Sequence, residues 1–260
     1  MRFIIVMTIT LVHFSSWGDV NFISGGMDAG GSGHGLVCFS DEIAAREVRE
    51  TVGNVSDVNV GKLVSIIPID LWFARMPAGR PPRPANLQSP LPHDDEYSFL
   101  ERILSRVDQA LPPLGKKLRS AEESFRPQNR KIKWVPISIQ MILDSGVNLR
   151  IDQMPTCAIS MLAWQIMIEG GHFLQVDPRL YERMDLMSRT TLWLHEYAYL
   201  VARTSGQTDS RATREIVATL LKASGEIRIR ELASLAQQLR FITPLEAAAY
   251  ENDDRFYPLQ

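Results

Sequence analysis

The sequence has little cysteine, little net charge and no apolar run of membrane-spanning length, and each shortage narrows what the protein can be. Its 28 basic and 30 acidic residues leave a formal net charge of −2. Binding to nucleic acid usually needs a strongly basic surface, so we expect no nucleic-acid partner. The 260 residues are enough for one large domain or two small ones with a sizeable core.

An apolar run stands at the N-terminus, where FIIVMTITLVHF follows Arg2. A transmembrane helix needs about 20 apolar residues, and this run has only about a dozen. The basic residue before it and the small residues Ser16 and Gly18 are typical of a cleaved export signal. We therefore predict a signal peptide over residues 1–18, a mature chain without a transmembrane span, and a periplasmic or secreted location. A buried first strand or helix is the alternative.

The two cysteines, Cys38 and Cys157, both lie in the predicted mature chain. An oxidising compartment permits them to pair, so we predict a disulfide between them. Closing a loop of about 120 residues would stabilise the fold by about 4 to 5 kcal/mol on loop entropy. Two separate buried thiols are the alternative.

The mature chain divides into a glycine-rich leader over residues 19–35 and a single domain over residues 36–260. The leader has almost no apolar content, which is typical of a flexible segment, and we expect its His34 to be solvated. Proline is frequent at about 77–93, where we expect an irregular insertion within the domain.

The patterning predicts an α+β fold, a small antiparallel sheet with a mainly helical C-terminal third. We expect strands at 35–39, at 62–76 with a break at Pro68, and at 131–139, and a hairpin over 164–176 that turns at Gly170-Gly171. Apolar spacing and capping residues predict helices at 41–52, 95–111 (with Tyr97 on the buried face), 114–125, 178–184, 188–203, 210–225, 232–239 and from Thr243 onward.

The segment HEYAY is one residue short of the His-Glu-x-x-His signature of a zinc peptidase helix. His195 and Tyr199 have the spacing of two ligands, and Glu196 stands where the catalytic base would be. A phenolate is a rare zinc ligand, and no second histidine follows within the nearby helix. We therefore expect no cofactor, with zinc as the alternative.

A metal-free site is a further interpretation. If the next helix folds back through the turn SGQTD, Asp209, Ser210 and Arg214 approach the His195 face. His195, Glu196, Tyr199, Ser210 and Arg214 are then the candidate catalytic residues for general acid–base work. The same residue types also suit a hydrogen-bonded network inside a buried helix pair, which is the interpretation that we favour.

The motif L-H-E-x-x-Y with D-S-x-x-x-R downstream, together with the upstream segments GLVC, IDLWFAR and PTC, resembles an uncharacterised family of exported proteins in Bdellovibrio-like predatory bacteria. The resemblance spans residues 33–214 and is most specific over 155–214. It implies that Tyr199 is typical of the family, and it implies an exported location, but it carries no reaction. The stretch from Pro77 to Pro127 departs from the family and is either a partner surface or a lid.

Two functions remain open on the sequence. The first is a non-catalytic interaction or structural protein of the cell envelope, whose partner is an envelope or host component. The alternative is a hydrolase that acts on peptide or cell-wall material through His195 and Glu196.

Overall fold

A computed structural model describes residues 33–51, 53–75, 86–125, 132–135, 154–168, 171–207, 210–223 and 225–258 of the chain. The predicted signal peptide, most of the predicted leader and Asp209 lie outside the described residues. Within them the fold is α+β, as the sequence predicts.

The strands form two small sheets of three strands each. In the first sheet, β1 lies between β2 and β4 and is antiparallel to both. In the second sheet, β6 lies between an antiparallel β5 and a parallel β3. The strands are β1 His34–Phe39, β2 Leu63–Pro68, β3 Ile132–Trp134, β4 Cys157–Met161, β5 Ala163–Ile168 and β6 Gly171–Val176.

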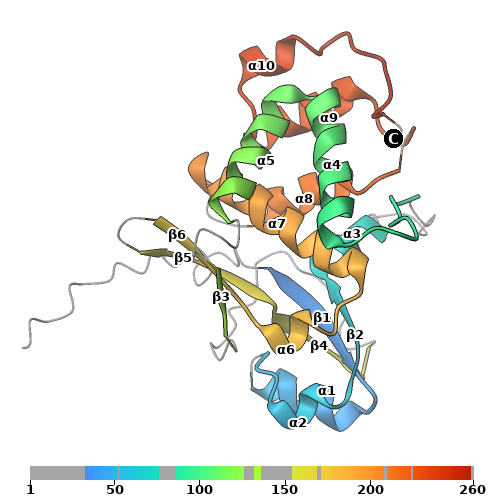
Figure 1. Ribbon diagram of the computed structural model, residues 1–260, viewed down its shortest axis with the longest axis vertical. Coiled ribbons are helices and arrows are strands. Elements are labelled where there is room, and N and C mark those ends of the chain that lie inside the picture. The colour runs from blue at the N-terminus through green and yellow to red at the C-terminus, as the bar shows by residue number, and fades with distance from the viewer. Residues whose placement is uncertain are drawn as a thin grey trace, which may run out of the picture.

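Most of the helices gather on one side of the two sheets, whereas the short helices α1, α2 and α6 lie beside the strands (Figure 1). The helices are α1 Glu42–Glu50, α2 Asp57–Val60, α3 Ile69–Arg75, α4 Glu96–Ala110, α5 Pro112–Ser124, α6 Pro178–Tyr181, α7 Leu186–Thr204, α8 Arg211–Leu220, α9 Ile229–Gln238 and α10 Pro244–Ala248. In the part of the chain that the structure describes, no helix has the length and hydrophobicity needed to cross a bilayer.

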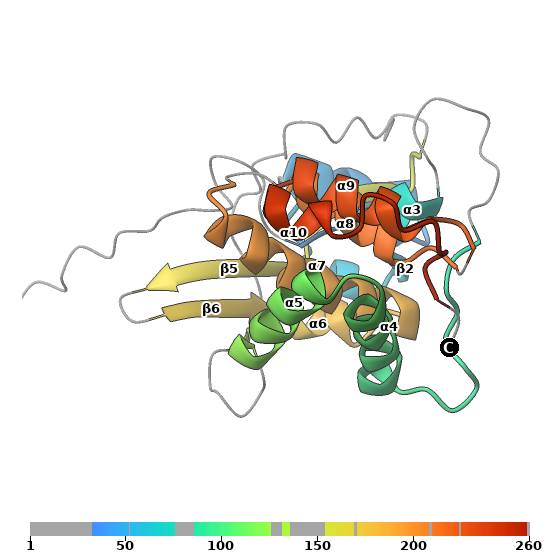
Figure 2. The same ribbon diagram turned by 90° about the horizontal axis from the view of Figure 1, so that it is seen from above.

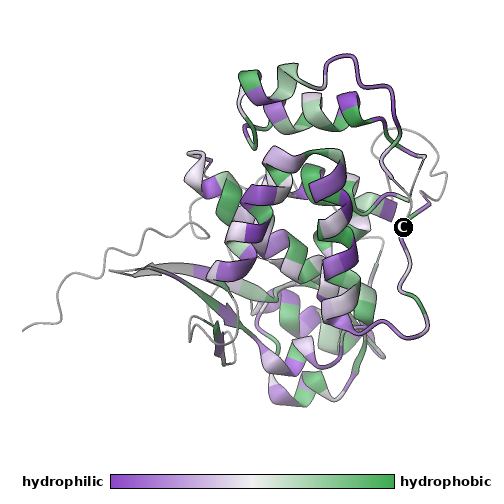
Figure 3. Ribbon diagram, turned by 45° about the horizontal axis from the view of Figure 1, so that its top comes forward, coloured by the Kyte–Doolittle hydropathy of each residue, from purple (hydrophilic) through white to green (hydrophobic). Residues whose placement is uncertain are grey.

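Helix α7 is the central helix of this arrangement. Seen from above, α4 and α5 lie along one side of it, and α3, α8 and α9 lie along the other (Figure 2). Leu114, Leu118 and Phe125 of the α5 region are all buried, as their spacing predicts. Hydrophobic and hydrophilic residues alternate around the outer helices (Figure 3), which is typical of helices that cover a core on one face. Helix α7 is covered on both sides instead, and almost all of it is buried.

Capping residues set most helix starts where the sequence predicts them. Asp95 opens α4 and Thr243 opens α10, each with a capping box, and Asp41 caps α1. Helix α7 begins earlier than predicted, because Asp185 rather than Ser188 accepts the hydrogen bond at its N-terminus. The prediction that Tyr97 is buried is wrong: its side chain is 60% exposed in the first turn of α4.

The strand predicted at 62–76 is a strand only as far as Pro68. The following residues form α3, although their β-branched and aromatic composition favours a strand. Proline 68 pairs with Gly35 at the end of the ladder and ends the strand. Ile69, Asp70, Leu71 and Ala74 are then buried at helical spacing as α3 packs against α8. Tertiary packing has overridden local propensity here.

The hairpin is present with its turn shifted by one residue. Gly171 pairs with Ile168 in the antiparallel ladder of β5 and β6. The two residues between them are Glu169 and Gly170, which lie outside the described residues, rather than the predicted Gly170-Gly171.

The predicted solvation of His34 is wrong. His34 is the first residue of β1 and is 4% exposed, and Gly33 before it is buried as well. Strand β1 is the central strand of its sheet, and the backbone oxygen of Gly33 accepts hydrogen bonds from Leu162 and Ala163. Residues 33–35, which the prediction assigned to the leader, therefore belong to the folded domain.

Part of the proline-rich insertion is attached to the helical side. Leu87 forms a β-bridge with Lys222, and the Gln88 backbone nitrogen donates to Leu221 at 2.9 Å. The Gln88 side-chain amide donates to the carbonyl oxygen of Leu220 at 2.7 Å. These bonds hold the C-terminal end of the insertion against the end of α8.

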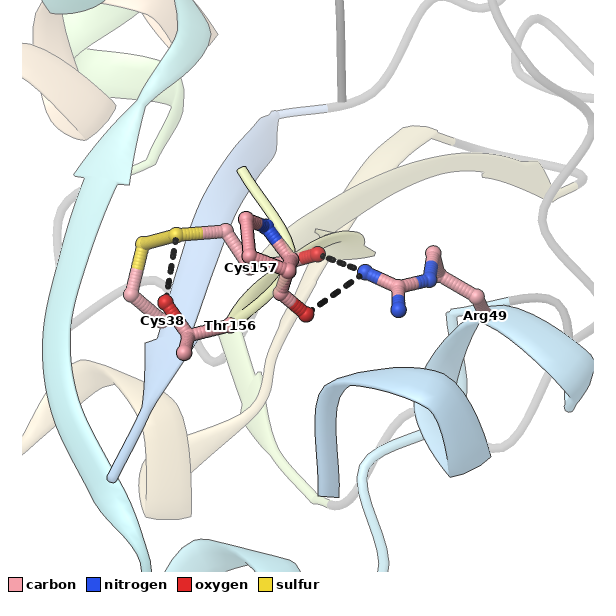
Figure 4. The surroundings of a disulfide bond; sticks show 5 residues. Cys38, Arg49, Thr156 and Cys157 are labelled. Carbon is pink, nitrogen blue, oxygen red and sulfur yellow. Dashed lines mark hydrogen bonds between the residues drawn. A yellow bond between two sulfur atoms is a disulfide. The ribbon is translucent and has the colours of Figure 1, made fainter. Parts of the chain in front are cut away.

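The predicted disulfide is confirmed. Cys38 of β1 and Cys157 of β4 face each other across the antiparallel ladder, with 2.10 Å between the two sulfur atoms. Arg49 of α1 donates to the carbonyl oxygens of Pro155 and Cys157, at 3.2 and 2.6 Å (Figure 4). The bridge and this arginine together join α1, β1 and β4.

Candidate functional site

The HEYAY segment lies in the middle of α7, where the helix has protein on both sides. His195 is 2% exposed, and Glu196 and Tyr199 are fully buried. The three side chains therefore meet other side chains rather than solvent.

His195 is hydrogen-bonded to Asp70 of α3. Its Nδ1 lies 2.9 Å from Asp70 Oδ1, and the Asp70 side chain is equally buried. Burial lowers the pKa of His195, but the charge and the hydrogen bond of Asp70, together with the charge of Glu196, outweigh this effect, so that the pKa lies above its ordinary value. The second ring nitrogen, Nε2, is buried without a hydrogen-bond partner among the described residues.

Glu196 fastens α7 to the strands. Its Oε1 accepts a hydrogen bond from the backbone nitrogen of Gly33 at 3.1 Å, and its Oε2 accepts one from Gln165 Nε2 at 2.8 Å. The same Gln165 nitrogen donates to the backbone oxygen of Glu196 at 2.7 Å. Burial raises the pKa of Glu196, while the charge of His195 and the bond from Gln165 oppose that rise.

Tyr199 takes part in packing, and its ring is stacked on His195. The two ring centroids are 6.0 Å apart with 20° between the planes. The guanidinium of Arg203 lies 5.7 Å from the centroid of the Tyr199 ring, within range of a cation–π contact. Tyr199 therefore fills space next to the imidazole.

Arg214 of α8 approaches the site from the side of Asp70. Burial lowers the pKa of this arginine, and the negative charge of Asp70 opposes the effect. Arg214 Nη1 donates to Ser210 Oγ at 2.7 Å, and its guanidinium lies 5.8 Å from the centroid of the Phe73 ring. We call Asp70, His195, Glu196 and Arg214 the buried cluster.

The structure thus brings His195, Glu196 and Tyr199 together, as the sequence predicts, and links Arg214 to them through Asp70. Ser210 contacts Arg214 and has no described bond to His195. Three residues that hold the site were not among the predicted candidates: Asp70, Gln165 and Gly33. The sequence does contain an indication for Asp70, because a single acidic residue in an apolar stretch such as IDLWFAR is expected to be buried with a polar partner.

Few side chains that could bind a metal ion lie together in this region. Among the described residues, no three or more His, Cys, Asp or Glu side chains are grouped so that they could hold a metal ion. The carboxylate of Glu196 is bonded to Gly33 and Gln165 instead. The expected absence of a cofactor stays a prediction.

The chain matches no protein-family model, no curated protein and no solved structure. The resemblance to exported proteins of predatory bacteria therefore stays a prediction.

Proposed function

We propose that the protein is a non-catalytic interaction or structural protein of the cell envelope, whose HEYAY helix forms an internal framework. The observation that carries this proposal is the burial of the candidate catalytic residues. His195, Glu196 and Tyr199 are at most 2% exposed; Nδ1 of His195 is bonded to Asp70, and the carboxylate of Glu196 is bonded to Gln165 and Gly33. A catalytic acid or base must come within hydrogen-bond reach of its substrate, and these side chains do not meet solvent.

The disulfide is compatible with a periplasmic or extracellular location, because such bonds persist in oxidising compartments. The apolar run after Arg2 and the resemblance to exported proteins support the same location. The partner that we propose is a component of the envelope or of a host cell.

One observation favours the second candidate, a hydrolase that acts on peptide or cell-wall material. Asp70 holds Nδ1 of His195 and leaves Nε2 without a described partner, which is how a carboxylate orients a histidine base. A hydrolase would additionally need a path from solvent to this nitrogen.

Hydrolysis assays separate the two functions. The purified mature protein is incubated with insoluble peptidoglycan and with an unfolded polypeptide, and released fragments are quantified. We expect no release. Time-dependent release that is lost in His195→Gln and kept in His93→Gln, which changes an exposed histidine, would establish the hydrolase.

The location is tested separately. The full-length chain is expressed in a Gram-negative host, the cells are fractionated, and the N-terminus of the product is sequenced. We expect an envelope or secreted product that begins at Asp19. An uncleaved product in the cytoplasm would contradict the proposed location.

A further inference from the structure

The buried cluster has a charge balance that depends on a single proton. Asp70 and Glu196 are acids and Arg214 is a base, so with a neutral imidazole the cluster carries two negative charges and one positive charge. Protonated His195 brings it to neutrality. Because an uncompensated buried charge is costly, folding favours the protonated form.

The imidazole and the carboxyl group of Glu196 are the two groups that can take up this proton. Burial raises the pKa of Glu196, whereas the N–H donors to both of its oxygens favour the ionised form. Nδ1 of His195 is bonded to Asp70. Nε2 has no hydrogen-bond partner among the described residues, so no hydrogen bond at this nitrogen favours either protonation state. The electrostatic balance with Asp70 and Glu196 therefore decides the protonation of the ring.

The charged and titratable groups around His195 come from several elements. Asp70 of α3 and Glu196 of α7 act on it electrostatically, and Tyr199 stacks on its ring. Arg214 of α8 acts on Asp70. Strand β1 carries a second buried imidazole, His34, directly after the Gly33 that bonds to Glu196.

These bonds join elements that are far apart in the sequence. Asp70 attaches α3 to α7 across 125 residues, and Glu196 attaches the start of β1 to α7 across 163 residues. Gln165 adds β5 to the same point. Loss of the proton from His195 therefore weakens the attachment of α3 and of the first strand to α7.

We propose that the buried cluster is a proton-dependent latch, which holds α3 and the start of β1 on α7 in acid and loosens them as the pH rises. The proposal goes beyond the proposed function and does not depend on it.

The direction of the effect follows from the bound proton. A histidine whose pKa is raised by folding stabilises the fold fully below its ordinary value of 6.5, and this contribution is lost as the pH rises through the folded value. The pKa of Glu196 is also raised, so its contribution to stability is likewise lost as the pH rises above the ordinary value of 4.5. Acids whose pKa is lowered, such as Asp41 and Asp253, lose their contribution to stability at a lower pH, below the ordinary value of 3.8.

The test is urea unfolding at constant ionic strength from about pH 5 to about pH 8.5. We expect the midpoint of the wild-type protein and of His93→Gln to fall as the pH rises, and we expect a smaller fall in His195→Gln, in which Glu196 is the remaining group of the buried cluster with a raised pKa. Hydrogen exchange, corrected for the intrinsic rate, should show faster opening of Gly33–Phe39 and Ile69–Arg75 at the higher pH in the wild type. A flat wild-type midpoint, or an equal fall in His195→Gln, would overturn the latch.

A second measurement needs no variant. The imidazole of His195 is followed by NMR in the wild-type protein over the same pH range. The latch requires the pKa of His195 to lie above its ordinary value of 6.5. A pKa of His195 at or below 6.5 would overturn the proposal even if His195→Gln does not fold.

Discussion

The molecule contains two groups of linked charges, and they differ in exposure to water. One is the buried cluster inside the helices, where the side chains of Asp70 and His195 are each 2% exposed. The other joins α4 to α5 and consists of Arg119 with Glu101, Asp108 and Glu122; we call it the surface network.

In the surface network one guanidinium is bonded to three carboxylates. Arg119 Nη2 lies 2.6 Å from Glu101 Oε1, and its Nε lies 3.0 Å from Asp108 Oδ2. The hydrogen bonds that Arg119 donates to Glu101 do most to hold the pKa of Arg119 above its ordinary value. Three of the four side chains are partly open to solvent, 25% for Arg119, 42% for Glu101 and 39% for Asp108, whereas Glu122 is 4% exposed.

The difference in burial sets the expected energetic importance of each group of charges. At the surface, water can replace a lost partner, so breaking an ion pair costs about 0 to 1 kcal/mol. In the interior, the remaining charge is left without a partner, and the cost rises to about 3 to 5 kcal/mol. The buried cluster should therefore be the more sensitive of the two.

Loss of the disulfide should have the largest effect on stability. The bridge anchors β1, and the residue directly before this strand, Gly33, is bonded to Glu196 of the buried cluster. The loop that it closes spans 119 residues, so replacing both cysteines with serine should lower the free energy of unfolding by about 4 to 5 kcal/mol. Urea unfolding of the variant and of the wild-type protein measures the change. Two reactive thiols in the native, unreduced protein would contradict the bridge itself.

Asp70→Ala tests the buried cluster directly. It removes the partner of His195 and a negative charge that acts on Arg214, so we expect a loss of about 3 to 5 kcal/mol in the free energy of unfolding. The matched change in the surface network, Asp108→Ala, should cost no more than about 1 kcal/mol. Equal losses for the two variants in urea unfolding would contradict the comparison.

Gly33→Ala tests the contact between the first strand and Glu196. A Cβ atom at Gly33 would lie 2.5 Å from Leu192 Cδ1 and 2.6 Å from Glu196 Oε1. We expect this overpacking to cost about 1 to 3 kcal/mol in thermal or urea unfolding. Gly61→Ala is the control, because its Cβ would meet nothing closer than 3.5 Å. A Gly33 variant as stable as the Gly61 variant would show that the contact is unimportant.

Glu101→Gln should have the smallest effect. It weakens the charge-assisted bonds to Arg119 in a partly exposed setting, so we expect a change of about 1 kcal/mol or less, further reduced by added salt. Unfolding at low and high ionic strength measures both. A loss as large as that of Asp70→Ala would remove the distinction between the two regions.

Local features of the fold could be predicted from the sequence, because they depend on neighbouring residues. Asp95 and Thr243 begin helices through bonds to the backbone three residues onward. The pairing of Cys38 with Cys157 followed from there being only these two cysteines in a chain predicted to be exported.

Long-range features could not be predicted in this way. The meeting of Asp70 with His195, and of Gly33 with Glu196, depends on how distant elements pack, and no local pattern encodes it. The same packing makes α3 helical, although its composition favours a strand, and it buries His34, although the glycine-rich composition before it favours a solvated segment. The HEYAY helix was therefore found from the sequence, but its partners were not.

A double-mutant cycle tests the central claim most directly, that His195 and Asp70 act as one buried structural unit. Asp70→Asn, His195→Gln and the double variant are compared by urea unfolding at about pH 6, beside an Arg119→Gln and Glu101→Gln cycle in the surface network. We expect a coupling energy of about 1 to 3 kcal/mol in the buried pair, larger than that of the surface pair. A coupling near zero in the buried pair, or no larger than that at the surface, would contradict the account.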